Sequence, residues 1–150
     1  MSDSAGTPIT VLLVDDHDLI RQGLSRAFER SDDFAVVGHG ATVEQGIELA
    51  TRLKPRVVVT DVRMPDGSGL DLVAALRAED SEVGLVVLTM YAGDDQLFSA
   101  MQAGASAFVA KDSPAADVLS AARHAAVAPR AFSAAGLTEA MQRKMNPTGP

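Results

Sequence analysis

The chain has 150 residues, about the length of one domain, and 47% of them are hydrophobic, which is enough to fill a core of ordinary size. Its net charge of -7 argues against a nucleic-acid-binding surface, because such modules normally have a basic face. The absence of cysteine rules out disulfides, thiolate metal sites and cysteine nucleophiles. No apolar segment approaches the ~20 residues needed to cross a bilayer, and the N-terminus lacks a signal-peptide pattern, so we expect a cytoplasmic protein without membrane contact.

Five short apolar segments recur along the chain, and a stretch with the spacing of an amphipathic helix follows each of them. The segments are continuously apolar rather than alternating, which is typical of strands that are buried on both faces. We expect strands at residues 9–14, 34–38, 57–60, 85–89 and 107–110. This alternation predicts an α/β fold with a doubly wound parallel sheet and helices on both faces.

Several expected helices have recognisable ends. Thr42, with Gln45 three residues later, has the pattern of a capping box, while Gly104 suits a helix end and Pro114 a first turn. We expect helices at residues 18–30, 42–54, 69–79, 94–103 and 114–127, and a short one at about 137–144. In such sheets ligands bind beyond the C-terminal ends of the strands, so we look for function there.

Polar residues stand at the C-terminal ends of most of the expected strands. Asp15 and Asp16 follow the first strand, Asp61 follows the third, Thr89 ends the fourth and Lys111 follows the fifth. A single acid in such a place often only caps the next helix, and a lone lysine or threonine there is often ordinary surface or core. The five residues together are hard to explain in that way, and we expect them to meet at one rim of the sheet.

The chemistry of this set is coherent. Three carboxylates held close repel one another, and a divalent cation removes that repulsion. Hard oxygen ligands suit Mg²⁺, which can also neutralise a phosphoryl group and hold it in line with a carboxylate nucleophile. Aspartate carboxylates are known to form phosphorylated intermediates. In such an intermediate of this chain, Lys111 would pair with the phosphoryl oxygens and the Thr89 hydroxyl would bond to one of them.

Together with residues 57–65 and the turn at 67–69, these strand-end residues resemble the receiver domain of two-component response regulators. The resemblance covers about residues 9–127 and implies a flavodoxin-like (βα)5 fold with the strand order 2-1-3-4-5. It also implies a phosphoacceptor switch that takes its phosphoryl group from a sensor histidine kinase. Such a switch is not an enzyme and shows at most slow self-dephosphorylation.

The resemblance also assigns roles to individual residues. Asp61 would be the phosphoacceptor. Asp16 would bind Mg²⁺ directly and Asp15 through water, and the backbone carbonyl of Arg63 would be a further metal ligand. Lys111 would stabilise the phosphoryl group.

Three residues near this site leave alternatives open. In the family, the threonine equivalent to Thr89 and the aromatic residue equivalent to Phe108 act as the switch, although Phe108 is also compatible with ordinary core packing. His17 follows the acid pair and could ligate a metal, but we expect a residue at the start of the helix with its ring toward solvent.

The sequence is similar to the NarL/FixJ, or LuxR-type, branch of the family. The Val-Asp-Asp-His opening that ends at His17, residues 21–24, residues 104–108 and the Lys111-Asp112 pair all match that branch. Many other receivers have proline after the lysine. Members of the branch carry a helix-turn-helix DNA-binding domain after the receiver.

This resemblance predicts how the chain is divided. We expect residues 1–8 to be an N-terminal tail, 9–127 the receiver, and 128–150 a linker toward a helix-turn-helix domain that is absent from this fragment. DNA would be bound only through that missing domain, where it would serve transcription regulation. A homodimer of receivers is plausible, but no residue indicates its face.

Two rival functions remain open. A phosphatase of the haloacid-dehalogenase type would need a second acid two residues after Asp61, and Arg63 occupies that place. A receiver-like module that acts without phosphorylation usually lacks an acid or the lysine, and this chain retains all of them. Turnover of small phosphate esters would separate the phosphatase from the receiver.

Overall fold

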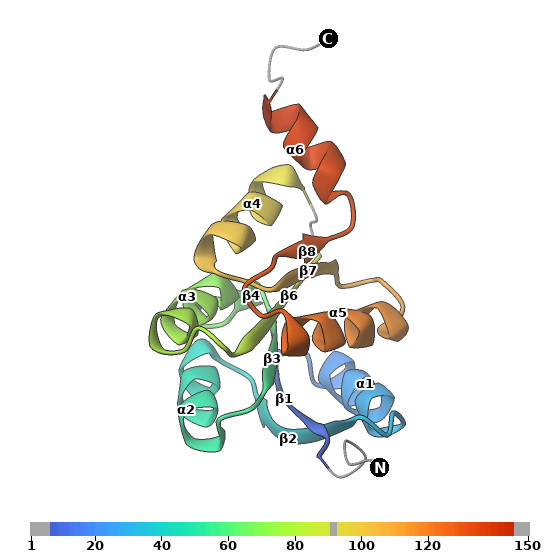
Figure 1. Ribbon diagram of the computed structural model, residues 1–150. Coiled ribbons are helices and arrows are strands. Elements are labelled where there is room, and N and C mark those ends of the chain that lie inside the picture. Colours follow the sequence, from blue (N-terminus) through green and yellow to red (C-terminus); the bar gives the residue numbers. More distant parts are fainter. Residues whose placement is uncertain (1–6, 91–92, 146–150) are drawn as a thin grey trace.

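The structure is a computed structural model that describes residues 7–90 and 93–145. A six-stranded parallel sheet forms its centre (Figure 1). The strands lie in the order β2-β1-β3-β6-β7-β8, and every neighbouring pair is parallel. The predicted fold and the order of its five main strands are confirmed, and β8 adds a short strand at the edge beside β7. The bounds are β1 (Ile9–Val14), β2 (Phe34–Gly40), β3 (Val57–Asp61), β6 (Gly84–Thr89), β7 (Ala107–Ala110) and β8 (Ser133–Ala134).

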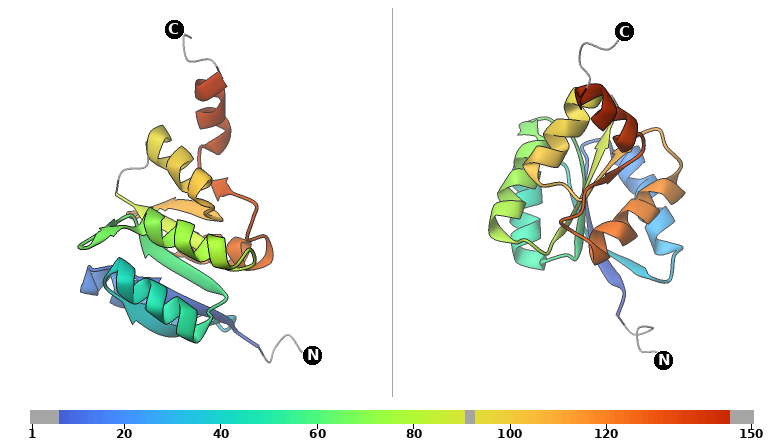
Figure 2. Two further views of the ribbon diagram at one scale, coloured as in Figure 1. Left: turned by 90° about the vertical axis from the view of Figure 1, so that its left-hand side faces the viewer. Right: turned by 45° about the horizontal axis from the view of Figure 1, so that its top comes forward.

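Helices cover both faces of this sheet (Figure 2). One face carries α1 and α5, and the other carries α2, α3 and α4. The bounds are α1 (Asp18–Glu29), α2 (Val43–Leu53), α3 (Gly69–Glu79), α4 (Asp94–Ala103) and α5 (Ala115–Val127). None of the helices within the described ranges is both long and apolar enough to span a membrane.

The continuous apolar strands divide their side chains between two cores. In β1, Val11 and Leu13 belong to the cluster that contains Phe28 of α1, whereas Leu12 and Val14 belong to the cluster beneath α2, α3 and α4. Successive side chains of a strand point to opposite faces, so a strand covered on both sides has to be apolar throughout. This explains why the sequence shows runs instead of alternation.

Two predicted helix ends are confirmed by their geometry. The hydroxyl oxygen of Thr42 accepts a hydrogen bond from the backbone N–H of Gln45 at 3.0 Å, and the Gln45 side chain accepts one from the N–H of Ala41 at 2.7 Å. Gly104 ends α4 with a φ of 104°, in the left-handed region that glycine adopts without strain.

A tight turn follows β3 and fixes the chain just after Asp61. It contains two antiparallel two-residue strands, β4 (Arg63–Met64) and β5 (Gly67–Ser68). The N–H of Gly69 donates to the carbonyl oxygen of Val62 at 2.7 Å, and a Cβ at Gly69 would lie 1.9 Å from the carbonyl oxygen of Asp61. Only glycine allows this approach, so the turn is held against the end of β3.

The described part of the C-terminal tail packs on the domain through β8 and α6 (Leu137–Met145). Ala140 of α6 is 1% exposed and belongs to the core cluster beneath α4. The guanidinium of Arg143 forms two hydrogen bonds with the carboxylate of Asp94, at 2.6 and 2.9 Å. The short helix expected here is therefore present, and it lies against α4 (Figure 1). Residues 1–6 and 146–150 of the expected tails lie outside the described residues.

Candidate functional site

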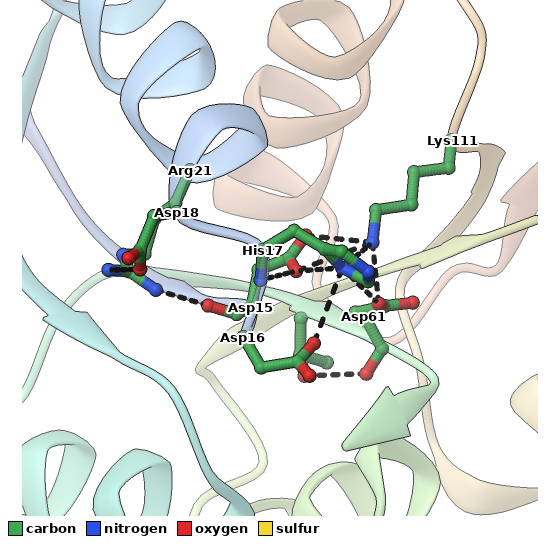
Figure 3. Close-up of polar contacts among 8 residues, drawn as sticks. Asp15, Asp16, His17, Asp18, Arg21, Asp61 and Lys111 are labelled. Atoms are coloured by element: carbon green, nitrogen blue, oxygen red, sulfur yellow. Dashed lines mark hydrogen bonds and ion pairs between the residues drawn. The ribbon is translucent and has the colours of Figure 1, made fainter. Parts of the chain in front are cut away.

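The strand ends bring four of the predicted polar residues, Asp15, Asp16, Asp61 and Lys111, together at one edge of the sheet (Figure 3). Val14 of β1 pairs with Thr60 of β3, so Asp15 and Asp61 come one residue later on neighbouring strands. Parallel strands end at the same edge, which is why residues so far apart in the chain meet here.

Lys111 reaches across this edge to two acids. Its Nζ atom lies 2.6 Å from Oδ2 of Asp61 and 3.1 Å from Oδ2 of Asp15. The side chain of Lys111 is 1% exposed, and those of both acids are 4% exposed. A buried charge of this kind is tolerated only with partners of opposite sign, so the three side chains hold one another in place.

Two opposing effects set the pKa of Lys111. Burial lowers the pKa, but hydrogen bonds and charge interactions with Asp61 and Asp15 raise it, and the net result lies above the ordinary value of 10.5. Lys111 is therefore an ammonium at neutral pH, with protons to donate and no lone pair.

A group of potential metal ligands surrounds this ion pair. Asp15, Asp16, His17 and Asp61 each offer one donor atom, and these atoms all lie within 4.8 Å of one another. The Oδ2 atom of Asp15 is buried and accepts no hydrogen bond from the described residues, although Lys111 is close to it. Asp16 is 35% exposed in its side chain, so the group opens to solvent on that side. Three carboxylates with one open side fit Mg²⁺, which prefers oxygen ligands and keeps several waters.

His17 stands at the start of α1 with 57% of its side chain exposed, as expected, but its ring also contacts the acids and Lys111. Its Nδ1 atom lies 3.0 Å from Oδ1 of Asp15, 3.3 Å from Oδ1 of Asp16 and 3.0 Å from Nζ of Lys111 (Figure 3). The backbone N–H of His17 donates to Oδ1 of Asp15 at 2.8 Å, and this local turn folds the residue back over the acids. Spacing in the sequence contains no signal for such a side-chain direction.

Thr89 and Phe108 are both buried but do not join the cluster of charges. The Thr89 hydroxyl donates to Oε1 of Gln96, in the first turn of α4. Phe108 is 4% exposed and packs in the core cluster beneath α2, α3 and α4.

Arg63 begins β4 with its side chain at the surface, two residues beyond Asp61. The described residues contain no cis peptide bond, so the bond between Lys111 and Asp112 is trans.

Comparison with known proteins identifies the family. Residues 11–123 match the family model described as the response regulator receiver domain. This chain belongs to that family. The receiver is 34% identical over 117 residues to the transcriptional regulatory protein LiaR of Bacillus subtilis, covering 78% of this chain and 56% of LiaR. It is also 34% identical over 128 residues to the nitrate/nitrite response regulator protein NarL of Escherichia coli, covering 85% of this chain and 59% of NarL.

Solved structures agree with this placement of the receiver. A LuxR-family two-component response regulator from Aurantimonas sp. SI85-9A1 superposes with a TM-score of 0.82 at 28% identity, over 93% of this chain and 99% of that one. The predicted NarL/LuxR-type branch is therefore confirmed. The chain spans a little more than half the length of the curated relatives named above.

Proposed function

We propose that this receiver acts in the cytoplasm, where Asp61 accepts a phosphoryl group from a phosphohistidine of a sensor histidine kinase in the presence of Mg²⁺. In the full-length protein, the resulting change of shape would control a DNA-binding domain that regulates transcription. The observation that supports this most strongly is the 2.6 Å contact between Asp61 Oδ2 and Lys111 Nζ, two side chains that are 4% and 1% exposed. It places a carboxylate nucleophile beside a fixed positive charge.

The chain itself provides the nucleophile and the charges around it. A carboxylate oxygen of Asp61 forms a bond to phosphorus as the bond between phosphorus and the donor's histidine nitrogen breaks, which gives an acyl phosphate. The transfer adds negative charge next to Asp61. Lys111, held as an ammonium, neutralises part of that charge and contacts the phosphoryl oxygens.

The acids and the turn after β3 would hold the metal. Asp15, Asp16, Asp61 and the backbone carbonyl of Arg63 are the groups that we assign to Mg²⁺. When bound, the ion supplies positive charge between the acids and the incoming phosphoryl group. Asp16 is the most exposed of the three acids, so water can reach the remaining positions around the ion.

Thr89 and Phe108 are the switch residues in this proposal. The Thr89 hydroxyl is hydrogen-bonded to the neutral amide oxygen of Gln96, and a charged phosphoryl oxygen is a stronger acceptor. An exchange of acceptor would release the first turn of α4 from the end of β6. Phe108 lies in the core beside α4 and would repack with it, which shifts the population between two states of this surface.

We infer that the receiver is a switch with slow self-dephosphorylation at most. A fast phosphatase needs a general acid near the phosphorylated aspartate, and the place two residues on is taken by Arg63, whose guanidinium does not serve as one.

The proposal is tested by incubating the protein with acetyl phosphate and Mg²⁺ and measuring its intact mass. We expect the wild type to gain the mass of one phosphoryl group, and Asp61→Asn to gain none. Asp66→Asn is the matched control, because Asp66 lies on the same turn and bonds instead to the backbone N–H groups of Val43 and Glu44. Equal labelling of the wild type and Asp61→Asn would overturn the assignment.

A further inference from the structure

Arg21 of α1 contacts the backbone just beyond the end of β1. Its Nη1 atom donates a hydrogen bond to the backbone carbonyl oxygen of Asp15, and its Nη2 atom donates one to Oδ1 of Asp18 at 2.7 Å (Figure 3). The guanidinium therefore bridges the peptide group that follows β1 and the first turn of α1. It approaches from the side away from Lys111, whose ammonium contacts the carboxylates instead.

The carbonyl oxygen of Asp15 stands where the pairing of β1 with its neighbours ends. The last paired residue of β1 is Val14, and Asp15 is only 3% exposed. The N–H of Asp15 still donates to the carbonyl oxygen of Gly40 of β2 at 2.9 Å. A buried carbonyl group needs a donor, and beyond the strand end the side chain of Arg21 provides one.

The peptide group that Arg21 holds is the one that joins the two adjacent acids. Because a peptide group is planar, fixing its oxygen fixes the orientation of the plane from which the side chains of Asp15 and Asp16 project. The Asp15 carboxylate has further local support, since its Oδ1 atom accepts a hydrogen bond from the N–H of His17 at 2.8 Å. The Asp16 side chain is 35% exposed, so its direction depends more on this backbone.

An ordinary surface ion pair does not account for the position of Arg21. The side chain of Arg21 is 15% exposed, whereas that of its partner Asp18 is 72% exposed. The Nε atom of Arg21 is buried and donates no hydrogen bond within the described residues. A pair that served only to link one helical turn would leave the guanidinium in water, where no donor is left without an acceptor. The contact with the Asp15 carbonyl explains why the guanidinium lies inward.

We propose that Arg21 is a positioning residue for the divalent-cation site, which holds the Asp15–Asp16 peptide group so that both carboxylates face the ion. Arg21 itself touches neither the ion nor the phosphoryl group. This inference rests on the Mg²⁺ site of the proposed function.

The charge of Arg21 acts in the opposite sense to this role. A positive charge near the acids repels a second cation, so loss of the charge alone would tighten Mg²⁺ binding. Loss of the hydrogen bond to the backbone would weaken it, because metal affinity depends on how outer groups orient the ligands. The sign of the change in affinity therefore separates the two effects.

Isothermal titration of the metal-free protein with MgCl₂ tests the proposal. We expect Arg21→Gln to bind Mg²⁺ about tenfold more weakly than the wild type, or weaker still. Arg21→Lys keeps the charge but replaces the fork by a single ammonium, so its affinity should stay at least about threefold below that of the wild type. Arg26→Gln is the matched control, because it removes one positive charge from an exposed position of the same helix and should change the affinity by less than about twofold.

Two further measurements separate positioning from simple support of the helix. Asp18→Ala removes the ion pair but not the contact with the carbonyl, and should weaken Mg²⁺ binding by less than about threefold. In the metal-free protein, the amide ¹⁵N chemical shift of Asp16 reports hydrogen bonding at the carbonyl of the same peptide group. It should move in Arg21→Gln and stay in place in Arg26→Gln.

The outcomes distinguish this inference from the proposed function. Mg²⁺ binding that depends on Asp16 but is unchanged or tighter in Arg21→Gln overturns the inference and leaves the proposed function standing. Full affinity in Arg21→Lys, or a loss in Asp18→Ala as large as that in Arg21→Gln, also overturns it. A wild-type protein that binds no Mg²⁺ overturns both. Urea titration reports whether each variant is folded, and Arg21→Lys provides the test if Arg21→Gln is not.

Discussion

The hydroxyl of Thr89, at the end of β6, donates a hydrogen bond to the side-chain oxygen of Gln96, in the first turn of α4. Two residues earlier, Asp94 of the same turn binds Arg143 of α6. A set of contacts therefore runs from the end of β6, through the first turn of α4, to the C-terminal segment. Under the proposed function, a movement of Thr89 toward the phosphoryl group would act first on α4.

Substitution of Gln96 by alanine should favour the phosphorylated arrangement. The variant removes the acceptor that competes with the phosphoryl group for the Thr89 hydroxyl, and one such hydrogen bond is worth roughly 1 kcal/mol. We expect Gln96→Ala to bind beryllofluoride, a phosphoryl mimic, about fivefold more tightly in the presence of Mg²⁺. Gln96→Glu keeps an acceptor oxygen and should not gain affinity. Weaker binding by Gln96→Ala would contradict the role given to this contact.

Substitution of Asp16 by asparagine should stabilise the metal-free protein and abolish its response to Mg²⁺. Removing one of three crowded carboxylates relieves repulsion on the order of 1 kcal/mol. In the wild type, Mg²⁺ at a hundred times its Kd should add about 2.7 kcal/mol to the free energy of unfolding, measured by urea titration. Asp112→Asn, at an exposed position after Lys111, should keep the full response. A Mg²⁺ response retained in Asp16→Asn would show that the ion binds elsewhere.

Substitution of Arg143 by alanine should loosen α6 without unfolding the domain. The Arg143–Asp94 pair is largely exposed, so its loss should leave the global stability nearly unchanged. Hydrogen exchange of the amides in α6 should nevertheless become faster, because local opening needs less free energy than global unfolding. Arg130→Ala, at an exposed position before β8, is the control. Unchanged exchange in Arg143→Ala would mean that Ala140 and its apolar neighbours hold the helix alone.

The pair between Asp33 and Arg123 predicts a pH dependence at the opposite side of the fold. The hydrogen bond from Arg123, at 2.7 Å, is the main cause that lowers the pKa of Asp33 from 3.8 to about 2. A lowered pKa means stability that is present above pH 3.8 and is lost as the pH falls toward 2. Both side chains are 45% exposed, so solvent screening keeps the effect below about 1 kcal/mol.

Urea titrations between pH 7 and pH 2 test this effect. Asp33→Asn should be slightly less stable than the wild type at pH 7 and equal to it near pH 2. Asp32→Asn, at the neighbouring exposed position, should run parallel to the wild type throughout. A constant difference between Asp33→Asn and the wild type at every pH would argue against the ion pair as its cause.

The sequence was sufficient to predict those parts of the site that lie at the ends of strands. An apolar strand that is buried on both faces ends where its apolar run ends, so the sequence alone predicts that Asp61 and Lys111 lie at one edge of the sheet. The contact between them then follows from the parallel register of β3, β6 and β7. The order of the strands came from the family resemblance, not from the hydrophobic pattern.

Other features of the site depend on tertiary contacts, which the hydrophobic pattern of the sequence does not predict. The ring of His17 is directed by the carboxylates around it, while its neighbours in sequence predicted only the start of a helix. The contact of Gln96 with Thr89 depends on how α4 lies over the sheet. Strand β8 has only two residues, Ser133 and Ala134, and two residues are too few to show a strand pattern.

The most direct test of the central claim is to identify the residue that becomes phosphorylated. Treatment of the phosphorylated protein with borohydride reduces an acyl phosphate to an alcohol, so a phosphorylated aspartate is converted to homoserine at its own position. Peptide mass spectrometry should then find homoserine at residue 61, in amounts that depend on Mg²⁺ and fall strongly in Lys111→Met. Homoserine at residue 15 or 16 instead, or phosphate on a residue away from this edge of the sheet, would contradict the account.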